Sequence, residues 1–535
     1  MRQIKTILVF LLCVSALLPF CLQGKTELTE AAAADHTVRI GIAVPESGTT
    51  LRTAYLGCDA GFVIGRSNGE EFSSRFELAE KAIVVIPDRN YKVKCDAENA
   101  SGRATDEGNF FAYHILVKSG FSDFVSAKTA ASAYADGFVG WDGKSFDVRR
   151  GSYPTKEQAA EHGTPTEPIP YGLAVIDAAN SKLLFEYACG DGFALKGKGG
   201  SDVMTYCNSD SAKPYPGFFE ISCETNMRII NVLDLETYVK CVMSNEIGTN
   251  QTRETRKAFS VLARTVPFES KHGVHGYDVC ACSCCQVYFG NYRRDKENDA
   301  IVDSTKGEVV TYKGQPIHCL YHNSNGGTSC SSVAAWGGEE IPYLVSVTLP
   351  EDENNQSAVW QRVFSKEEFN DYLHARSSFS ALTGEIDKVS IESTDPYGSD
   401  YVTLLSITDA NGNELRLENA MPIRNALGIQ SGNFTVTYTM DATVVNADGS
   451  VTKEKAAGYL DADGCYHAFD SFSETFAIAE TGKTATADTL TLDGLGTGHG
   501  VGFSSNGSEQ LAKEGFSYKY ILGFYYPGTK LDKLY

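Results

Sequence analysis

The stretch from Leu233 to Gly290 constrains the fold of this 535-residue chain more than any other part of it. Asp234 is a good helix N-cap, and after it apolar residues recur with the spacing of one helix face. These apolar residues are Leu235, Val239, Val242, Met243 and Ile247. Glu246 follows Met243 by three positions, so it lies on or beside the same face. The pattern predicts an amphipathic helix with a carboxyl group at the edge of a core.

A carboxyl group in that position is partly removed from water, which raises its pKa and favours the neutral acid. General-acid catalysis of glycosidic bond cleavage needs such a group. A helix-end glutamate at the rim of a core, with no part in catalysis, has the same sequence pattern. Periodicity alone therefore leaves two interpretations of Glu246 open.

A second helix is predicted from the cap residue Thr252 to about Val266. Lys257 and Arg264 are seven positions apart and share one face of this helix. Two cations beside a partly buried carboxyl group are suited to orienting a polar substrate. Taken alone, however, such cations more often belong to a solvated helix face.

These two helices belong to a series of motifs that occur in a fixed order. The first are L-E-T-Y-V-K-C-V-M-S-N-E-I, E-T-R-K-A-F-S-V-L-A-R-T and C-Q-V-Y-F-G. The later ones lie at Lys306 to His322 with the following N-S-N-G-G-T, at Arg424 to Thr435, and at Gly496 to Leu531. Together they resemble the stage II sporulation protein D family, which includes the LytB-type amidase enhancers. The resemblance runs over roughly residues 215–535, about sixty per cent of the chain.

The resemblance implies an α+β enzyme with a helix-bearing catalytic core and β-rich surroundings. It also implies a lytic transglycosylase that cleaves peptidoglycan glycan strands, with a preference for strands without stem peptides, and leaves 1,6-anhydro-muramyl products. The catalytic glutamate of the family matches Glu246, and its helix cations match Lys257 and Arg264. The alternative is a non-catalytic glycan-binding protein that enhances a cell-wall amidase.

The number of carboxyl groups separates two kinds of glycan cleavage. In a lytic transglycosylase one carboxyl group can serve as both acid and base, because the attacking group is a hydroxyl of the sugar itself. A hydrolase ordinarily needs a second carboxylate at a set distance. Asp278, Glu339 and Glu340 are available by residue type, but the sequence does not place them.

The stretch from His272 to Cys285 holds two histidines and four cysteines in the pattern H-x2-H-x4-C-x-C-x-C-C. Structural zinc takes four such ligands in a tetrahedron, and some members of the resembled family carry a Cys/His zinc site in this loop. The predicted ligands are His275, Cys280, Cys284 and Cys285, with His272 and Cys282 as substitutes. A disulfide between Cys280 and Cys285 is the alternative.

Two Gly-rich turns are predicted to line the substrate cleft, because glycine lets the backbone approach a ligand. His322 and Ser324 belong to the first turn and His499 to the second, G-T-G-H-G-V-G. All three are predicted substrate-binding residues. Trp336 and Tyr343 are suited to stacking on sugar faces, although core packing suits them equally well.

Composition and hydropathy divide the rest of the chain. The predicted segments are a signal peptide at 1–24, a β-rich accessory segment at 36–105, a small module at 110–163, and a catalytic domain at 171–535 with an insertion near 441–488. The module has the β-α-β-β-α order of a ferredoxin-like fold. Its F-D-V-R-R-G-S-Y motif resembles a SPOR-type glycan-binding domain. A scaffold segment that binds nothing is the alternative.

Charge and the N-terminal segment indicate the compartment. The formal net charge of −21 makes nucleic acid a poor partner, whereas a glycan is recognised mainly by hydrogen bonds and stacking. Residues 1–24 predict export to the cell wall or the medium, and an uncleaved membrane anchor is the alternative. The expected partners are peptidoglycan and, in the enhancer interpretation, an amidase.

Overall fold

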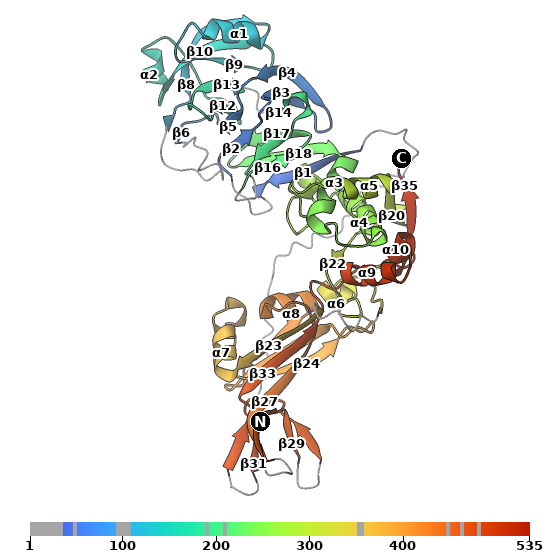
Figure 1. The fold of residues 1–535 in the computed structure, drawn as a ribbon. Helices are drawn as coiled ribbons and strands as arrows, with labels where there is room; N and C mark the ends of the chain where they lie inside the picture. Colours follow the sequence, from blue (N-terminus) through green and yellow to red (C-terminus); the bar gives the residue numbers. More distant parts are fainter. Residues whose placement is uncertain are drawn as a thin grey trace.

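The computed structural model shows an elongated molecule with three regions in a row (Figure 1). The residues that the structure describes are 36–45, 51–92, 109–187, 192–206, 211–349, 358–445, 450–460, 465–478 and 483–535. Helices and strands occur together through these ranges, which confirms the α+β fold class. Every helix within them is too short or too polar to cross a membrane. The predicted signal peptide lies outside the described residues.

The first region, called here the two-sheet region, consists of the strands between residues 36 and 234 together with β19. Its seven-stranded sheet has the order β19 (Val279–Cys280), β1 (Thr37–Ala43), β18 (Met227–Asp234), β17 (Phe218–Cys223), β14 (Phe193–Gly197), β3 (Phe62–Ser67), β4 (Phe72–Leu78). Its ten-stranded sheet has the order β11 (Thr164–Thr166), β8 (Tyr113–Phe121), β10 (Phe146–Tyr153), β9 (Gly137–Trp141), β13 (Leu183–Tyr187), β12 (Leu173–Asp177), β5 (Ala82–Pro87), β2 (Ala54–Gly57), β15 (Val203–Thr205), β16 (Lys213–Tyr215).

These sheets join strands that are far apart in the sequence. β1 pairs antiparallel with β18, placing Ile40 opposite Asn231, and β5 pairs antiparallel with β12. The buried faces of both sheets share one hydrophobic core. The strands of residues 36–105, predicted as an accessory segment, therefore do not form a layer of their own. The sheets cross the domain boundary that the sequence suggested at residue 171.

The predicted ferredoxin-like module has the expected order of elements. α1 (Phe124–Ala131) follows β8, and α2 (Lys156–Ala160) follows β10. The side chain of Asp123 caps α1 by accepting the N–H of Ser126 at 2.8 Å. The strand order β11-β8-β10-β9 is that of a split β-α-β unit, but β9 also pairs parallel with β13. The module is thus one end of the ten-stranded sheet.

The second region, the helical region, is built around α4 (Arg253–Thr265). The other helices and strands here are α3 (Leu235–Glu246), α5 (Lys296–Ser304), α6 (Ser332–Trp336), α9 (Ser505–Lys513), α10 (Tyr518–Tyr525), β20 (Glu308–Tyr312), β21 (Gln315–Pro316), β35 (Lys530–Lys533), β22 (Tyr321–His322) and β34 (Phe503–Ser504). As predicted, Asp234 caps α3 by accepting the N–H of Thr237 at 2.9 Å. The apolar face of α3 is buried. Burial of each large apolar side chain stabilises the fold by about 1.5–3 kcal/mol.

The third region, the distal region, spans residues 358–495 and has a hydrophobic core of its own. Its elements are β23 (Val359–Ser365), α7 (Lys366–His374), β24 (Ile386–Thr394), β25 (Val402–Asp409), β26 (Glu414–Glu418), α8 (Ala420–Leu427), β27 (Asn433–Val445), β28 (Val451–Ala456) and β33 (Thr489–Leu495). The hairpins β29 (Gly458–Leu460) with β30 (Tyr466–Ala468), and β31 (Thr475–Ile478) with β32 (Lys483–Thr486), form its tip (Figure 1). The predicted insertion at 441–488 corresponds to this tip. The separate core was not predicted.

Candidate active site

Glu246 is the last residue of α3, and its carboxyl group is partly buried. Oε1 accepts the backbone N–H of Val287 at 2.5 Å. Burial raises the pKa of Glu246, while the hydrogen bonds from Val287 and from the Tyr321 hydroxyl oppose the rise. The net shift is upward, so the neutral acid persists to higher pH than in an exposed glutamate. This is the electrostatic state that a general acid requires.

The segment that holds Glu246 is itself fixed from two sides. The Tyr238 hydroxyl of α3 donates to the side-chain oxygen of Gln286 at 2.7 Å, and both groups are fully buried. The Tyr288 hydroxyl donates to Asn231 of β18 at 2.7 Å. Val287 lies between these two anchors, so its N–H has little freedom to move away from the carboxyl group.

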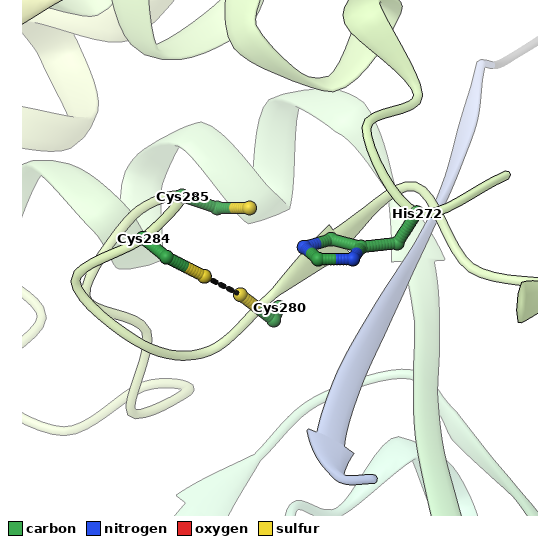
Figure 2. Close-up of side chains that lie close together, drawn as sticks. All are labelled: His272, Cys280, Cys284 and Cys285. Atoms are coloured by element: carbon green, nitrogen blue, oxygen red, sulfur yellow. Dashed lines mark hydrogen bonds between the residues drawn. The ribbon is translucent and has the colours of Figure 1, made fainter. Parts of the chain in front are cut away.

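The Cys-rich loop directly precedes this segment. The sulfurs of Cys280, Cys282 and Cys284 lie 2.8–3.0 Å from one another. The ligand atoms of His272, Cys280, Cys284 and Cys285 all lie within 4.8 Å of one another, and Figure 2 shows the His272 ring facing the three sulfurs. His272 Nε2 is buried and has no hydrogen-bond partner.

The donor set fits a structural zinc site. Three thiols and one imidazole are typical zinc ligands, and an orphaned buried ring nitrogen is where a cation would bind. Hydrogen bonds from the thiols of Cys280 and Cys282 lower the pKa of Cys284, which favours the thiolate form that binds metal. Cys280 and Cys285, the partners of the alternative disulfide, are both free thiols in this structure.

The histidine of this cluster is not the predicted one. His275 belongs to a short 3₁₀ turn, Gly273–His275, and its ring stacks on Tyr277 at 6.4 Å between centroids. Gly276, with φ of 79°, ends that turn in the left-handed region. His272, three residues earlier, faces the sulfurs instead. The prediction of His275 as a ligand is corrected to its substitute, His272.

Residues 223–312 match the family model described as stage II sporulation protein. This range contains Glu246, α4 and the whole Cys-rich loop. The chain carries a stage II sporulation protein D domain.

Three relatives support this assignment. The amidase enhancer of Bacillus subtilis (strain 168) is 27% identical over 310 residues, covering 55% of this chain and 40% of that protein. Stage II sporulation protein D of the same strain is 24% identical over 343 residues, 61% of this chain and 82% of that protein. Its counterpart in Bacillus amyloliquefaciens is 24% identical over 326 residues, 58% and 77% of the two chains. The SPOR resemblance of residues 110–163 stays a prediction.

The two predicted substrate-binding cations of the stage II sporulation protein D domain have protein partners. Lys257 pairs with Glu254 at 2.9 Å and lies 5.2 Å from the centre of the Tyr518 ring. Arg264 is fully buried and holds the Glu236 carboxylate with two hydrogen bonds of 2.8 and 2.9 Å. A substrate cannot reach Arg264 in this structure. Its prediction as a substrate ligand is corrected to a role in the core.

The residues of the two Gly-rich turns lie together beside β22. Ser324 is fully buried, and His322 is 6% exposed, so neither offers a surface to a glycan. His499 Nε2 bonds to the Tyr321 carbonyl oxygen at 2.9 Å, and Val501 donates its N–H to Nδ1 at 3.0 Å. Burial lowers the pKa of His322 well below its usual range and that of His499 to about 4. His322 and Ser324 are therefore part of the packing beside β22, whereas His499 is half-buried and its role in substrate binding stays a prediction.

The two aromatic residues predicted to stack on sugar faces, Trp336 and Tyr343, also contact protein groups. The Trp336 ring packs 5.5 Å from the His499 ring, and the Tyr343 hydroxyl receives the N–H of His318 at 3.1 Å. Tyr321, in contrast, was not singled out from the sequence, although its hydroxyl bonds to Glu246. It lies inside the Lys306 to His322 motif, which was the only signal that could have found it.

Proposed function

We propose that this protein is a peptidoglycan lytic transglycosylase in which Glu246 is the general acid and base. The observation that carries the proposal is that Glu246 is partly buried, has a raised pKa and accepts the Val287 N–H inside the range that matches the stage II sporulation protein model. The names of the relatives, a sporulation protein and an amidase enhancer, support a role at the bacterial cell wall.

The proposed reaction uses one carboxyl group twice, first as an acid and then as a base. Neutral Glu246 gives its proton to the glycosidic oxygen as the bond to the anomeric carbon breaks. The resulting carboxylate takes the proton from the C6 hydroxyl of the same sugar, and that oxygen closes on the anomeric carbon. The product is a 1,6-anhydro sugar, no water is consumed, and Glu246 ends neutral, ready for the next cycle.

The surroundings of Glu246 favour this one-carboxyl scheme over hydrolysis. Among the residues that the structure describes, the groups that act on its pKa are the Val287 N–H and the Tyr321 hydroxyl. Neither is a carboxylate. The carboxylate of Asp278 accepts a hydrogen bond from the Arg39 N–H at 3.0 Å, and that of Glu340 accepts one from the Tyr397 hydroxyl at 2.9 Å. The hydroxyl of Tyr321 is placed to orient the carboxyl group rather than to attack.

A zinc ion in the Cys-rich loop is part of this proposal, with a structural role. His272, Cys280, Cys284 and Cys285 would hold it, and four protein ligands leave no open position for water. Cys285 is followed directly by Gln286 and Val287, the residues that anchor α3 and Glu246. Fixing the loop would therefore fix the donor of the catalytic carboxyl group. Oxidation of Cys280 and Cys285 to a disulfide is the competing state.

Export to the cell wall, with the glycan strand as partner, belongs to the same proposal. The second candidate is a non-catalytic enhancer of an amidase, favoured by the amidase enhancer relative. The whole of that relative is much longer than the matched part, so its activity is not carried over. A SPOR-type role of residues 110–163 would add glycan binding to either function.

Incubation of the protein with denuded glycan, followed by mass spectrometry of the products, tests the proposal. Anhydro-muramyl ends are expected with the native chain and with the control Glu224→Gln, an exposed glutamate of the same domain. They are not expected with Glu246→Gln. Reducing ends without anhydro sugars would indicate hydrolysis. Binding without cleavage, together with stimulation of an added amidase, would favour the enhancer.

A further inference from the structure

The two-sheet region contains a second cluster of potential ligands, far along the chain from Glu246. Asp88 follows β5, His114 lies on β8, and Glu186 lies on β13. One ligand atom from each lies within 4.8 Å of the other two. Their exposed fractions are 5%, 0% and 1%. The sequence gives no motif for this cluster, because the three residues are 26 and 72 positions apart.

The curvature of the sheet brings them together. β8 and β13 are separated by β10 and β9, and three strand spacings of about 4.8 Å would put them about 14 Å apart in a flat sheet. Instead, His114 Nε2 lies 2.6 Å from Glu186 Oε1. The strands from β8 to β5 therefore curl so that their inner faces meet. The cluster closes the gap between the ends of this curl.

Three buried polar atoms of the cluster have no regular hydrogen bond, namely Asp88 Oδ1, His114 Nε2 and Glu186 Oε1, although the last two lie 2.6 Å apart. The other atom of each group is used. Asp88 Oδ2 accepts the Ile169 N–H at 3.1 Å, and Glu186 Oε2 accepts from Arg149 at 2.7 Å. His114 Nδ1 lies 2.6 Å from the Gly151 carbonyl oxygen, which can only accept, so Nδ1 carries a proton.

If His114 carries no second proton, the lone pair on its Nε2 faces two carboxylates. Such a contact is repulsive unless a cation or a proton lies between the atoms. The balance of buried charges also favours a cation or a proton in the cluster. Among the described residues, Arg149 is the permanent cation beside Asp88, Glu186 and Asp147, and it bonds to both Asp147 and Glu186; a protonated His114, 2.6 Å from Glu186, would add a second positive charge. With His114 neutral, two negative charges remain uncompensated in a buried site, which is costly.

We propose that Asp88, His114 and Glu186 bind one divalent transition-metal cation. Two carboxylate oxygens and one imidazole nitrogen suit Zn²⁺ or Mn²⁺ better than the softer ions that prefer sulfur. One such ion cancels the two excess charges and gives each orphaned atom a partner. The bond from His114 Nδ1 to the Gly151 carbonyl group is the outer contact that orients a metal-bound imidazole.

The ion would act as a clamp between parts of the ten-stranded sheet. It would join β8 of the ferredoxin-like module to β13 and to the end of β5. Because all three ligands are buried, exchange with solvent should be slow, and the ion should be acquired as the chain folds. It would have no part in glycan cleavage at Glu246, and its presence is independent of the proposed enzyme activity.

Metal analysis of the full chain without an affinity tag tests the proposal. The Cys-rich loop is first disabled by Cys284→Ser with Cys285→Ser, which leaves this cluster intact. About one equivalent of Zn²⁺ or Mn²⁺ is expected in this background and almost none after adding Asp88→Asn, whose amide oxygen can still accept the Ile169 N–H. The matched control is Asp147→Asn, which removes one charge from the same network, leaves the three ligand atoms in place, and should keep the metal.

Crystallography makes the test independent of how the variants fold. For zinc, an anomalous difference peak at the metal edge, about 2.0–2.1 Å from His114 Nε2, is expected in crystals of the native chain. A folded protein without metal at this position would overturn the proposal and show that protons close the cluster. Metal retained by Asp88→Asn, with no peak beside His114, would overturn it as well.

Discussion

The two ends of α3 carry glutamates whose surroundings shift their pKa values in opposite directions. Glu236, in the first turn, would have its pKa raised by burial, but the hydrogen bonds and charge of Arg264 outweigh that effect and lower it. Glu246, in the last turn, has its pKa raised by burial, with only neutral donors beside it. The helix dipole acts in the same sense, because it favours a negative charge at the N-terminus of a helix and disfavours one at the C-terminus.

Burial alone therefore does not give a carboxyl group a raised pKa, because the partly buried Glu236 has a lowered one. Beside a cation, the partly buried carboxyl group of Glu236 is held as a carboxylate, whereas Glu246, with neutral donors beside it, keeps its proton to higher pH, as its proposed role requires. Arg264 decides the difference, and it serves Glu236 rather than the active site. Arg264, which the sequence predicted to lie near the substrate, thus joins α4 to the first turn of α3.

The largest effect is expected for Glu246→Gln. Glutamine keeps the size of the side chain and can still accept the Val287 N–H, so the fold should be retained. Loss of proton transfer should lower the cleavage rate by about 10²- to 10⁴-fold. Turnover of denuded glycan is measured beside the melting temperature. Near-normal turnover by the folded variant would contradict the role of Glu246.

Glu236→Gln should show the reverse pattern. It leaves the fully buried Arg264 without a counter-charge, and removing one partner of a buried pair costs about 3–5 kcal/mol. Urea unfolding should report most of that loss, while the folded fraction should keep its cleavage rate. Lys257→Gln, which breaks a partly exposed pair, is the control and should cost about 0–1 kcal/mol. Equal losses in the two variants would contradict the comparison.

Cys280→Ser should lower both the stability and the cleavage activity of the protein. The Cys280 thiol is fully buried at the centre of the ligand cluster, so loss of the proposed zinc should lower the melting temperature by several degrees. Activity should fall as a secondary effect, because the loop carries the Val287 donor. Zinc content, melting temperature and turnover are measured together. A variant that melts normally but is inactive would place the metal in the chemistry instead.

The smallest effects are expected from pH. Stabilisation by Glu236, whose folded-state pKa is lowered, should be complete above the usual value of 4.5 and lost as pH falls below it. The acid function of Glu246 runs the other way, since cleavage should decline as pH rises through its raised pKa. The stability of the native chain should therefore decrease as pH falls below 4.5, and its cleavage rate should decrease as pH rises through the raised pKa of Glu246. Both pH profiles are recorded for the native chain and for Glu236→Gln. In Glu236→Gln, only the loss of stability at acid pH should differ from that of the native chain.

Local sequence patterns determined much of the helical region. The helix over Leu235–Glu246, its Asp234 cap, and the position of Glu246 at the edge of the core all follow from interactions within a few residues. The element order of the ferredoxin-like module and the clustering of thiols before Cys285 are equally local. For such features, the side chains that interact are already neighbours along the chain.

Tertiary structure decided which partner each charged or polar group has. The 28 positions between Glu236 and Arg264, and the 41 between Glu246 and Val287, are bridged only by the folded path of the chain. The choice of His272 over His275 depended on one short turn. The separate core of the distal region depended on long-range strand pairing. Sequence periodicity reports which face is buried, but the pKa of a buried group depends on the charge that folding places against it.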